Sequence, residues 1–206
     1  MQQTKRSIPK SYVWAPIGLL VAGLLISAAF PALSAKRVKN ETIEATAMGT
    51  GNQMGQMIGI SVEIYEYSTP EEKQLLVDAF NKGQNQGLVN ALTKMHAVGH
   101  ISITGTLGYD LAFVHIIPTP TGRKIRFVTN RQLRFGEVLA DSQSTAFNLT
   151  AGEFDVNDTE KKKSSGVLYP ECQLTIDKEG QLKIELTQNA WKLVDVLDWQ
   201  GTPGVN

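Results

Sequence analysis

The sequence has little cysteine and no excess of charge of either sign. It contains one cysteine, Cys172, in 206 residues, which excludes a disulfide scaffold and a cysteine-rich zinc module. Its 20 basic and 20 acidic side chains balance, so net charge gives no support to nucleic-acid binding. With 42% hydrophobic and 19% charged residues, the chain is too apolar for a disordered protein. No catalytic motif is present either.

The first 35 residues have the pattern of a secretory signal peptide. Three basic residues lie among the first ten, and no further charge occurs before Lys36. Residues 17–30 (IGLLVAGLLISAAF) are almost purely apolar, and small residues follow them. A basic start, a short apolar run and a small-residue cleavage site are typical of a signal peptide. We expect cleavage after Ala35, with cleavage after Ser34 as the alternative.

An uncleaved membrane anchor is the other interpretation of this segment. A spanning helix needs ~20 apolar residues, and residues 11–35 carry no charge. The apolar run proper, residues 17–30, is shorter, which favours a cleaved peptide. The body is exported in both cases, to the periplasm or medium after cleavage, or anchored in the inner membrane. Membrane contact is expected only through residues 11–30, if they are retained.

The exported body is predicted to be one domain. Removing residues 1–35 leaves 17 basic and 20 acidic residues, a net charge of −3, in a length that suffices for a single core. Residues 36–57 are rich in glycine, methionine and amide side chains, which predicts a flexible lead-in. A strand at 42–47 is the alternative within that segment. The domain itself is assigned to residues 58–200.

Residues 68–98 predict two short helices. Thr69, Pro70 and Glu72 fit an N-cap, a first helical position and a capping box. Gly83 is expected to end the first helix, and the second is expected to run from about residue 86 to residue 98. The two helices would form an αα-hairpin.

The rest of the body predicts strands. Residues 58–67 and 124–127 alternate apolar and polar side chains, while residues 109–117 are apolar on both faces. A change of phase at residues 151–152 predicts a β-bulge. Gly180, in the DKEG sequence, predicts a hairpin turn with positive φ. Long parallel crossovers would need more helices. The expected fold is therefore α+β: a mainly antiparallel curled sheet or half-barrel of about seven strands with a two-helix hairpin, after an N-terminal signal helix.

Several stretches together resemble a group of small exported bacterial proteins known mainly as hypothetical proteins. The resemblance covers about residues 68–197 and rests on short matches in a constant order. These are STPEEKQLLVDAF (68–80), LVNALTKM (88–95), GHISITGTLGYDLAF (99–113), GRKIRFVTNRQLRFGE (122–137) and LTIDKEGQLKIEL (174–186). It implies a bacterial, exported setting and supplies no activity.

Two features of the sequence indicate candidate site residues. His115 shares its strand phase with Phe113 and Ile117, which predicts either a buried histidine or one that lines a pocket. Five positive charges fall within 12 residues without an acid, and they indicate a patch for an anion or lipid headgroup or a solvated strand face paired with acids. These five residues are Arg123, Lys124, Arg126, Arg131 and Arg134.

The remaining candidates favour structural roles. His96 and His100 have a helical metal-ligand spacing, but Gly99 between them is expected to end the helix, so no metal site is assigned. Cys172 shares the phase of its apolar neighbours and is expected to be buried and inert.

The sequence therefore predicts an exported, non-enzymatic, β-rich binding or structural module with no cofactor. Its partner is an unknown ligand or an envelope protein. One alternative is a membrane-anchored envelope protein that acts beside a partner. The other is a histidine-dependent metal hydrolase built on His115 or on the His96 and His100 pair.

Overall fold

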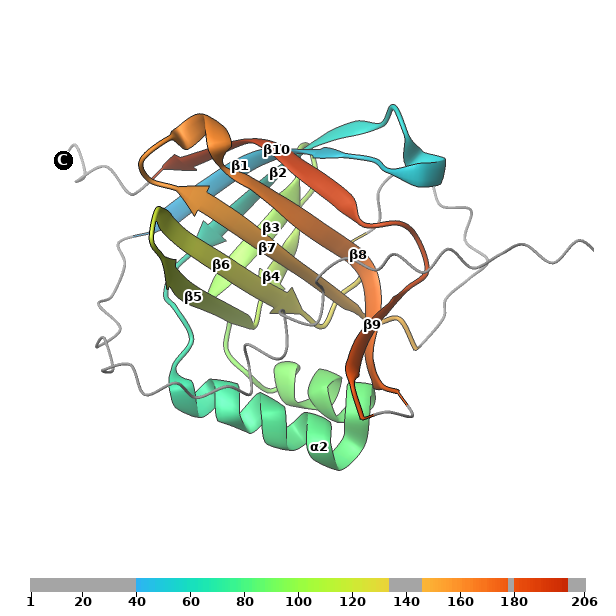
Figure 1. The fold of residues 1–206 in the computed structure, drawn as a ribbon. Helices are drawn as coiled ribbons and strands as arrows, with labels where there is room; N and C mark the ends of the chain where they lie inside the picture. Colours follow the sequence, from blue (N-terminus) through green and yellow to red (C-terminus); the bar gives the residue numbers. More distant parts are fainter. Residues whose placement is uncertain (1–39, 134–145, 178–179, 200–206) are drawn as a thin grey trace, which may run out of the picture.

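The computed structural model describes residues 40–133, 146–177 and 180–199, which form an antiparallel sheet with one helix (Figure 1). Ten strands hydrogen-bond in the order β4-β3-β2-β1-β10-β8-β7-β6-β5, and β9 pairs with β8. The strands are β1 (Glu41–Met48), β2 (Met57–Ile64), β3 (Gly99–Ile103), β4 (Tyr109–Leu111), β5 (Phe113–Thr119), β6 (Gly122–Thr129), β7 (Leu149–Asn157), β8 (Ser165–Ile176), β9 (Leu182–Leu186) and β10 (Trp191–Trp199). The helix is α2 (Pro70–Leu92), and two 3-10 turns are η1 (Gly51–Gln53) and η2 (Lys161–Lys163).

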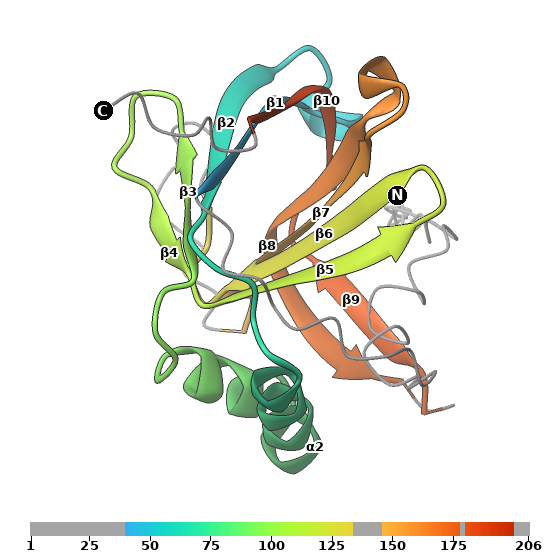
Figure 2. The same ribbon diagram turned by 90° about the vertical axis from the view of Figure 1, so that its left-hand side faces the viewer.

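The sheet curls into a nearly closed barrel (Figure 2). Strands β4 and β5 lie at opposite ends of the strand order, yet only Ala112 separates them in the chain. The two edges must therefore meet at Ala112. The backbone N–H of Ser68, in the segment before α2, donates to the carbonyl oxygen of Val114 on β5 at 2.8 Å and covers part of that edge.

The predicted two-helix hairpin and seven-strand half-barrel are wrong, because the described residues contain ten strands and a single helical element. The capping box at its start is present: the Thr69 hydroxyl accepts from the Glu72 N–H, and the Thr69 N–H donates to the Glu72 carboxylate. Gly83 does not end the helix. The backbone leaves helical geometry at Gln84 (φ 51°) and then resumes it to Leu92, so α2 is one bent element.

The segment assigned to a flexible lead-in contributes to the centre of the sheet. Residues 41–57 form β1, η1 and the first residue of β2, and β1 lies between β2 and β10. The strand considered at 42–47 is therefore present. Residues 1–39, with the predicted cleavage after Ala35 and the alternative anchor at 11–30, lie outside the described residues. Among residues 40–133, 146–177 and 180–199, no helix is long and apolar enough to cross a membrane.

Two apolar clusters lie on opposite sides of the same strands. The first fills the inside of the curled sheet, where Trp191, Phe154 and Ile43 are fully buried. The second lies between the outer surface of β5, β7, β8 and β9 and the helix α2, and it includes Phe80, Leu149 and Cys172. The helix thus covers one part of the outside of the sheet, rather than filling its interior.

Candidate functional site

A cluster of charged side chains occupies the inside of the sheet beyond the apolar core. Arg123 on β6 faces inward with Ile125 and Phe127, and it is only 8% exposed. One guanidinium nitrogen donates to Glu41 on β1 at 2.8 Å and to Asp198 on β10. We call Arg123, Glu41, Asp198, Asp158 and Tyr67 the interior ion cluster.

The other members add further hydrogen bonds to this cluster, although the buried Oδ1 of Asp198 receives none. A second nitrogen of Arg123 donates to Asp158 at 2.8 Å, and the Tyr67 hydroxyl donates to Glu41 at 2.5 Å. Glu41 is 2% exposed. One guanidinium thus serves three carboxylates from strands β1 and β10 and from the end of β7, which ties together strands that are not neighbours in the sheet.

The surroundings of the interior ion cluster shift the pKa values of several of its members. Burial and the neighbouring Glu41 carboxylate raise the pKa of Asp198 to about 6, although Arg123 opposes this. Burial would lower the pKa of Arg123, but Glu41, Asp198 and Asp158 together raise it above its usual value. Burial and Glu41 also raise the pKa of Tyr67, which stays a hydrogen-bond donor. The cluster therefore holds one carboxyl group, Asp198, whose pKa lies closer to neutral pH than that of an exposed aspartate.

The basic stretch does not gather on one surface. Arg123 lies inside the sheet, whereas Lys124 and Arg126 alternate with it and lie outside. Both outer residues pair with Glu153 on β7, at 2.8 Å and 2.6 Å. Burial alone would raise the pKa of Glu153. The hydrogen bonds and charges of Lys124 and Arg126 outweigh burial, so the pKa of Glu153 lies below its usual value. Arg131 is exposed after β6, and Arg134 lies outside the described residues.

His115 faces outward from β5, opposite Arg126 on β6. It is half-buried and stacks against Phe113, with ring centroids 6.1 Å apart. Burial, together with the charges of Lys73 on α2 and Arg126, lowers the pKa of His115 to about 4. The imidazole is therefore neutral at neutral pH. It is also not part of an enclosed interior pocket, because the interior of the sheet is on the other side of β5.

The other two histidines do not converge. His96 contacts Glu66 at 2.7 Å, while His100 contacts Asp110 at 3.3 Å and the Leu107 carbonyl oxygen at 2.8 Å. Within the described ranges, no three histidine, cysteine, aspartate or glutamate side chains could hold a metal ion together.

Cys172 is completely buried, as predicted, but it lies in the second apolar cluster while Leu168 of the same strand lies in the first. Burial raises the pKa of its thiol to about 12. A thiol that stays protonated is a poor nucleophile and a poor metal ligand.

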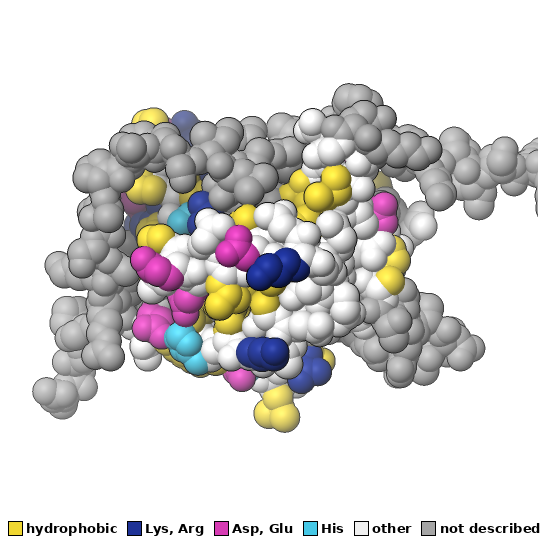
Figure 3. All heavy atoms as spheres, turned by 90° about the horizontal axis from the view of Figure 1, so that it is seen from below, with side chains coloured by type: hydrophobic (Ala, Val, Ile, Leu, Met, Phe, Trp, Pro, Cys, Tyr) yellow, Lys and Arg dark blue, Asp and Glu magenta, His cyan; other side chains and the backbone are white. Residues whose placement is uncertain are grey.

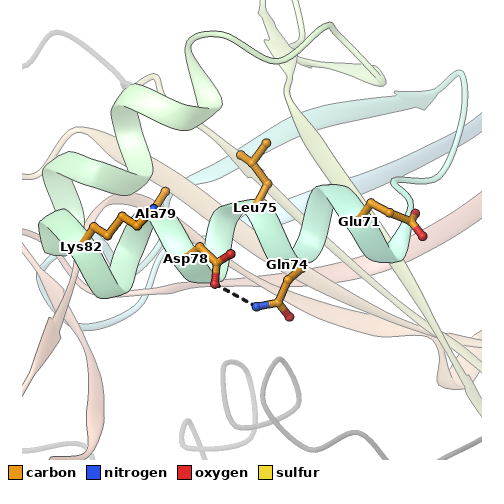
Figure 4. Close-up of a pocket in the computed structure, with 6 residues that line it drawn as sticks. All are labelled: Glu71, Gln74, Leu75, Asp78, Ala79 and Lys82. Carbon is orange, nitrogen blue, oxygen red and sulfur yellow. Dashed lines mark hydrogen bonds between the residues drawn. The ribbon is translucent and has the colours of Figure 1, made fainter.

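A hollow of about 570 Å³ lies on the outer side of α2 (Figure 4). The described residues that line it all belong to α2, and Gln74 and Asp78 within it bond to each other at 2.9 Å. Seen from below, the surface over α2 mixes acidic and basic side chains around a small apolar area (Figure 3). Among the described residues, the lining of this hollow comes from one helix and lacks the convergent polar groups of a ligand site.

Strands β10, β1, β2 and β3 carry a different surface on their outer side. Trp199 and Leu197 on β10 are 57% and 53% exposed. Leu197 is paired in register with Glu44, and the Trp199 indole N–H donates to the Glu44 carboxylate at 3.2 Å. This surface was not predicted from the sequence. The alternation of Leu197 and Trp199 with the buried Val196 in the last strand was the signal that could have located it.

More carboxylates extend this surface across the sheet. One row of registered partners runs from β10 to β4 through Trp199, Thr42, Glu63, His100 and Asp110. A second row runs through Leu197, Glu44, Ser61 and Ser102. We call the exposed residues Leu197, Trp199, Glu44, Glu63 and Asp110 the acidic outer face.

No protein-family model, curated protein or solved structure matches this chain. The resemblance to small exported bacterial proteins stays a prediction.

Proposed function

We propose that the protein is an exported, non-enzymatic binding module that recognises a partner protein through its acidic outer face. The observation that carries this proposal is the filled interior of the sheet. Large side chains such as Trp191, Phe154 and Ile43 occupy it, and the interior ion cluster occupies the space beyond them. A small-molecule carrier needs an enclosed cavity of several hundred Å³, so recognition outside the sheet is favoured over ligand storage inside it.

The acidic outer face has the composition of a protein-binding surface. Tryptophan is enriched among the residues that dominate binding energy, and Trp199 is more than half exposed. Its hydrogen bond to Glu44 already orients the indole, which lowers the entropy lost on binding. The carboxylates of Glu63 and Asp110 lie in the same row. The complementary partner is a protein segment that combines an apolar side chain with lysine or arginine.

Site-specific photo-crosslinking tests this proposal in cells that make the protein. A photoreactive amino acid at position 197 is expected to give one cross-linked partner, and the same amino acid at the exposed position 161 is expected not to. Trp199→Ala and Glu44→Lys are expected to remove the cross-link. Glu160→Lys is the matched control, because Glu160 is also an exposed acid but lies in the connection between β7 and β8 and not on β10, β1, β2 or β3.

Two results would overturn the proposal. One is an equal cross-linking yield at positions 197 and 161, or a yield that Trp199→Ala leaves unchanged. The other is a small apolar molecule that co-purifies at one equivalent and quenches the fluorescence of the buried Trp191.

A further inference from the structure

Three of the five methionines gather at one end of the hairpin formed by β1 and β2. Met48 ends β1, Met57 begins β2, and Met54 lies in the connection between them. Their exposed fractions are 37%, 80% and 62% for Met48, Met54 and Met57. Methionine is among the residues most often buried, so three exposed thioethers in ten residues need a reason other than packing.

The strand register brings two of these side chains together. Met48 and Met57 are direct partners across β1 and β2, and both lie on the outer side of the sheet. Directly opposed residues have Cβ atoms about 4.5–5.5 Å apart. Two flexible thioether side chains at that separation can place both sulfurs on one ion.

The connection that carries Met54 is held in place by hydrogen bonds. The Gly49 N–H donates to the Gln56 carbonyl oxygen at 2.9 Å and closes the loop. The Thr50 hydroxyl donates to the Ala190 carbonyl oxygen at 2.6 Å, and the Asn189 amide donates to the Thr50 carbonyl oxygen at 3.2 Å. The end of the hairpin projects from the sheet (Figure 1), and these bonds attach it to the segment before β10. The third thioether is therefore presented on an ordered turn.

We propose that Met48, Met54 and Met57 form a binding site for Cu(I). Thioether sulfur is a soft, neutral ligand that selects Cu(I), whereas imidazole and carboxylate suit Zn(II) and harder ions. Thioethers do not titrate, so binding needs no proton release. Lys192 on β10 is the register partner of Met48 on its other side, and its charge opposes a divalent ion more strongly than a monovalent one. The ligand is thus a soft monovalent metal ion bound by sulfur alone.

The binding test uses the purified full chain and Cu(I) kept reduced by ascorbate, in competition with a coloured Cu(I) chelator. One equivalent of Cu(I) is expected to bind, with no comparable binding of Zn(II). The triple variant Met48→Leu, Met54→Leu and Met57→Leu is expected to weaken binding at least tenfold. Leucine keeps the size and apolar character of each side chain, so folding is preserved.

Two controls separate this site from other sulfur atoms. Met95→Leu removes a thioether that packs against the second apolar cluster, and Cys172→Ala removes the buried thiol. Both variants are expected to bind Cu(I) as the unmodified protein does. Methyl resonances of methionine, followed by NMR with Ag(I) as a redox-stable probe, are expected to shift for Met48, Met54 and Met57.

The proposal is overturned if the triple variant binds Cu(I) as tightly as the unmodified protein. It is also overturned if Cys172→Ala abolishes binding, or if Ag(I) shifts only methionine resonances outside residues 48–57. This site is independent of the acidic outer face, so neither set of results decides the other.

Discussion

At the scale of single residues, the burial of Arg123 is the most consequential feature of the molecule. Its guanidinium lies against Glu41 and Asp198 inside the sheet. Removing one partner of a buried ion pair leaves an uncompensated charge, which costs about 3–5 kcal/mol. Arg123→Met is therefore expected to lower the free energy of unfolding by about that amount in a chemical denaturation experiment.

Two further variants test whether the unpaired carboxylates cause this loss. Lys124→Met changes the next residue, whose ion pairs are on the outer side of the sheet, and is expected to cost about 1 kcal/mol or less. Adding Glu41→Gln and Asp198→Asn to Arg123→Met is expected to recover part of the stability. If Lys124→Met proves as costly as Arg123→Met, the interior ion cluster is not what stabilises the fold.

Two partly buried groups, Asp198 and His115, give the stability of the protein opposing responses to pH. The pKa of Asp198 is raised from 3.8 to about 6 on folding, so its stabilising contribution is complete below about pH 4 and lost as the pH rises through 6. The pKa of His115 is lowered from 6.5 to about 4, so its contribution is complete above pH 6.5 and lost as the pH falls towards 4. The two effects partly cancel between pH 4 and 7.

Single substitutions are expected to separate these responses. Relative to the unmodified protein, Asp198→Asn should gain stability as the pH rises from 4 to 7, by at most about 3 kcal/mol. His115→Gln should show the opposite trend. Free energies of unfolding from urea titrations at several pH values provide the measurement. A pH dependence that neither substitution alters would contradict this assignment.

The strand alternation in the sequence indicates that Arg123 is buried, but the charge of Arg123 led to the opposite prediction. Ile125 and Phe127 were recognised as one face of a strand, and Arg123 belongs to the same alternation. Grouping it with Lys124 and Arg126 by charge placed it on the wrong side. The partners Glu41 and Asp198 were out of reach of sequence reasoning, because they lie 82 and 75 residues away and meet Arg123 only after the sheet curls.

At the scale of elements, the bend in α2 falls one residue later than its glycine. Gly83 has no other atom within 4 Å of an added Cβ, and its φ is not positive. Gln84 instead adopts φ 51° and ψ −145°, a conformation that favours glycine. The alternative of ending the helix at Gly83 is overridden by packing, because Leu88 and Leu92 beyond the bend are buried in the second apolar cluster.

Placing alanine at position 83 and glycine at position 84 is expected to stabilise the protein. Gly83→Ala should gain about 0.5–1 kcal/mol from helix propensity, and Gln84→Gly should gain about 1 kcal/mol from relieved backbone strain. The reverse control, Gln84→Ala, keeps the strain and should give little change. Thermal unfolding followed by circular dichroism provides the measurement, and a loss of stability in Gln84→Gly would contradict the argument.

The predicted β-bulge shows that the register of strand pairing could not be predicted from the sequence alone. Leu149 and Phe154 are out of phase, which predicted an irregularity at residues 151–152. In the structure β7 alternates without interruption, and both of its faces are buried. The extra residue belongs to β8, where Cys172 and Tyr169 oppose Leu149 and Ala151. The hairpin at Gly180 was confirmed, with φ 76°, because its turn chemistry is local.

At the scale of the whole molecule, the two apolar clusters share their strands. On β7, Leu149 packs outward under α2 while Phe154 and Val156 pack inward. The same strand supports both apolar clusters, so a loss of packing in one cluster is expected to destabilise the other. The helix and the curled sheet should therefore unfold in one cooperative transition. The edge junction at Ala112 adds to this coupling, since it joins the two ends of the sheet.

Substitutions in either cluster are expected to shift one common transition. Phe154→Ala leaves a cavity inside the sheet, and Phe80→Ala leaves one between α2 and the sheet. Each should lower the free energy of unfolding by about 3–5 kcal/mol. Far-ultraviolet circular dichroism follows the helix, and fluorescence follows the interior in a Trp14→Phe, Trp199→Phe background that retains Trp191. Both signals should change at the same urea concentration in every variant. If Phe80→Ala unfolds the helix at a urea concentration at which Trp191 is still buried, α2 is a separate folding unit. The shared strands would then not couple the packing of the two clusters.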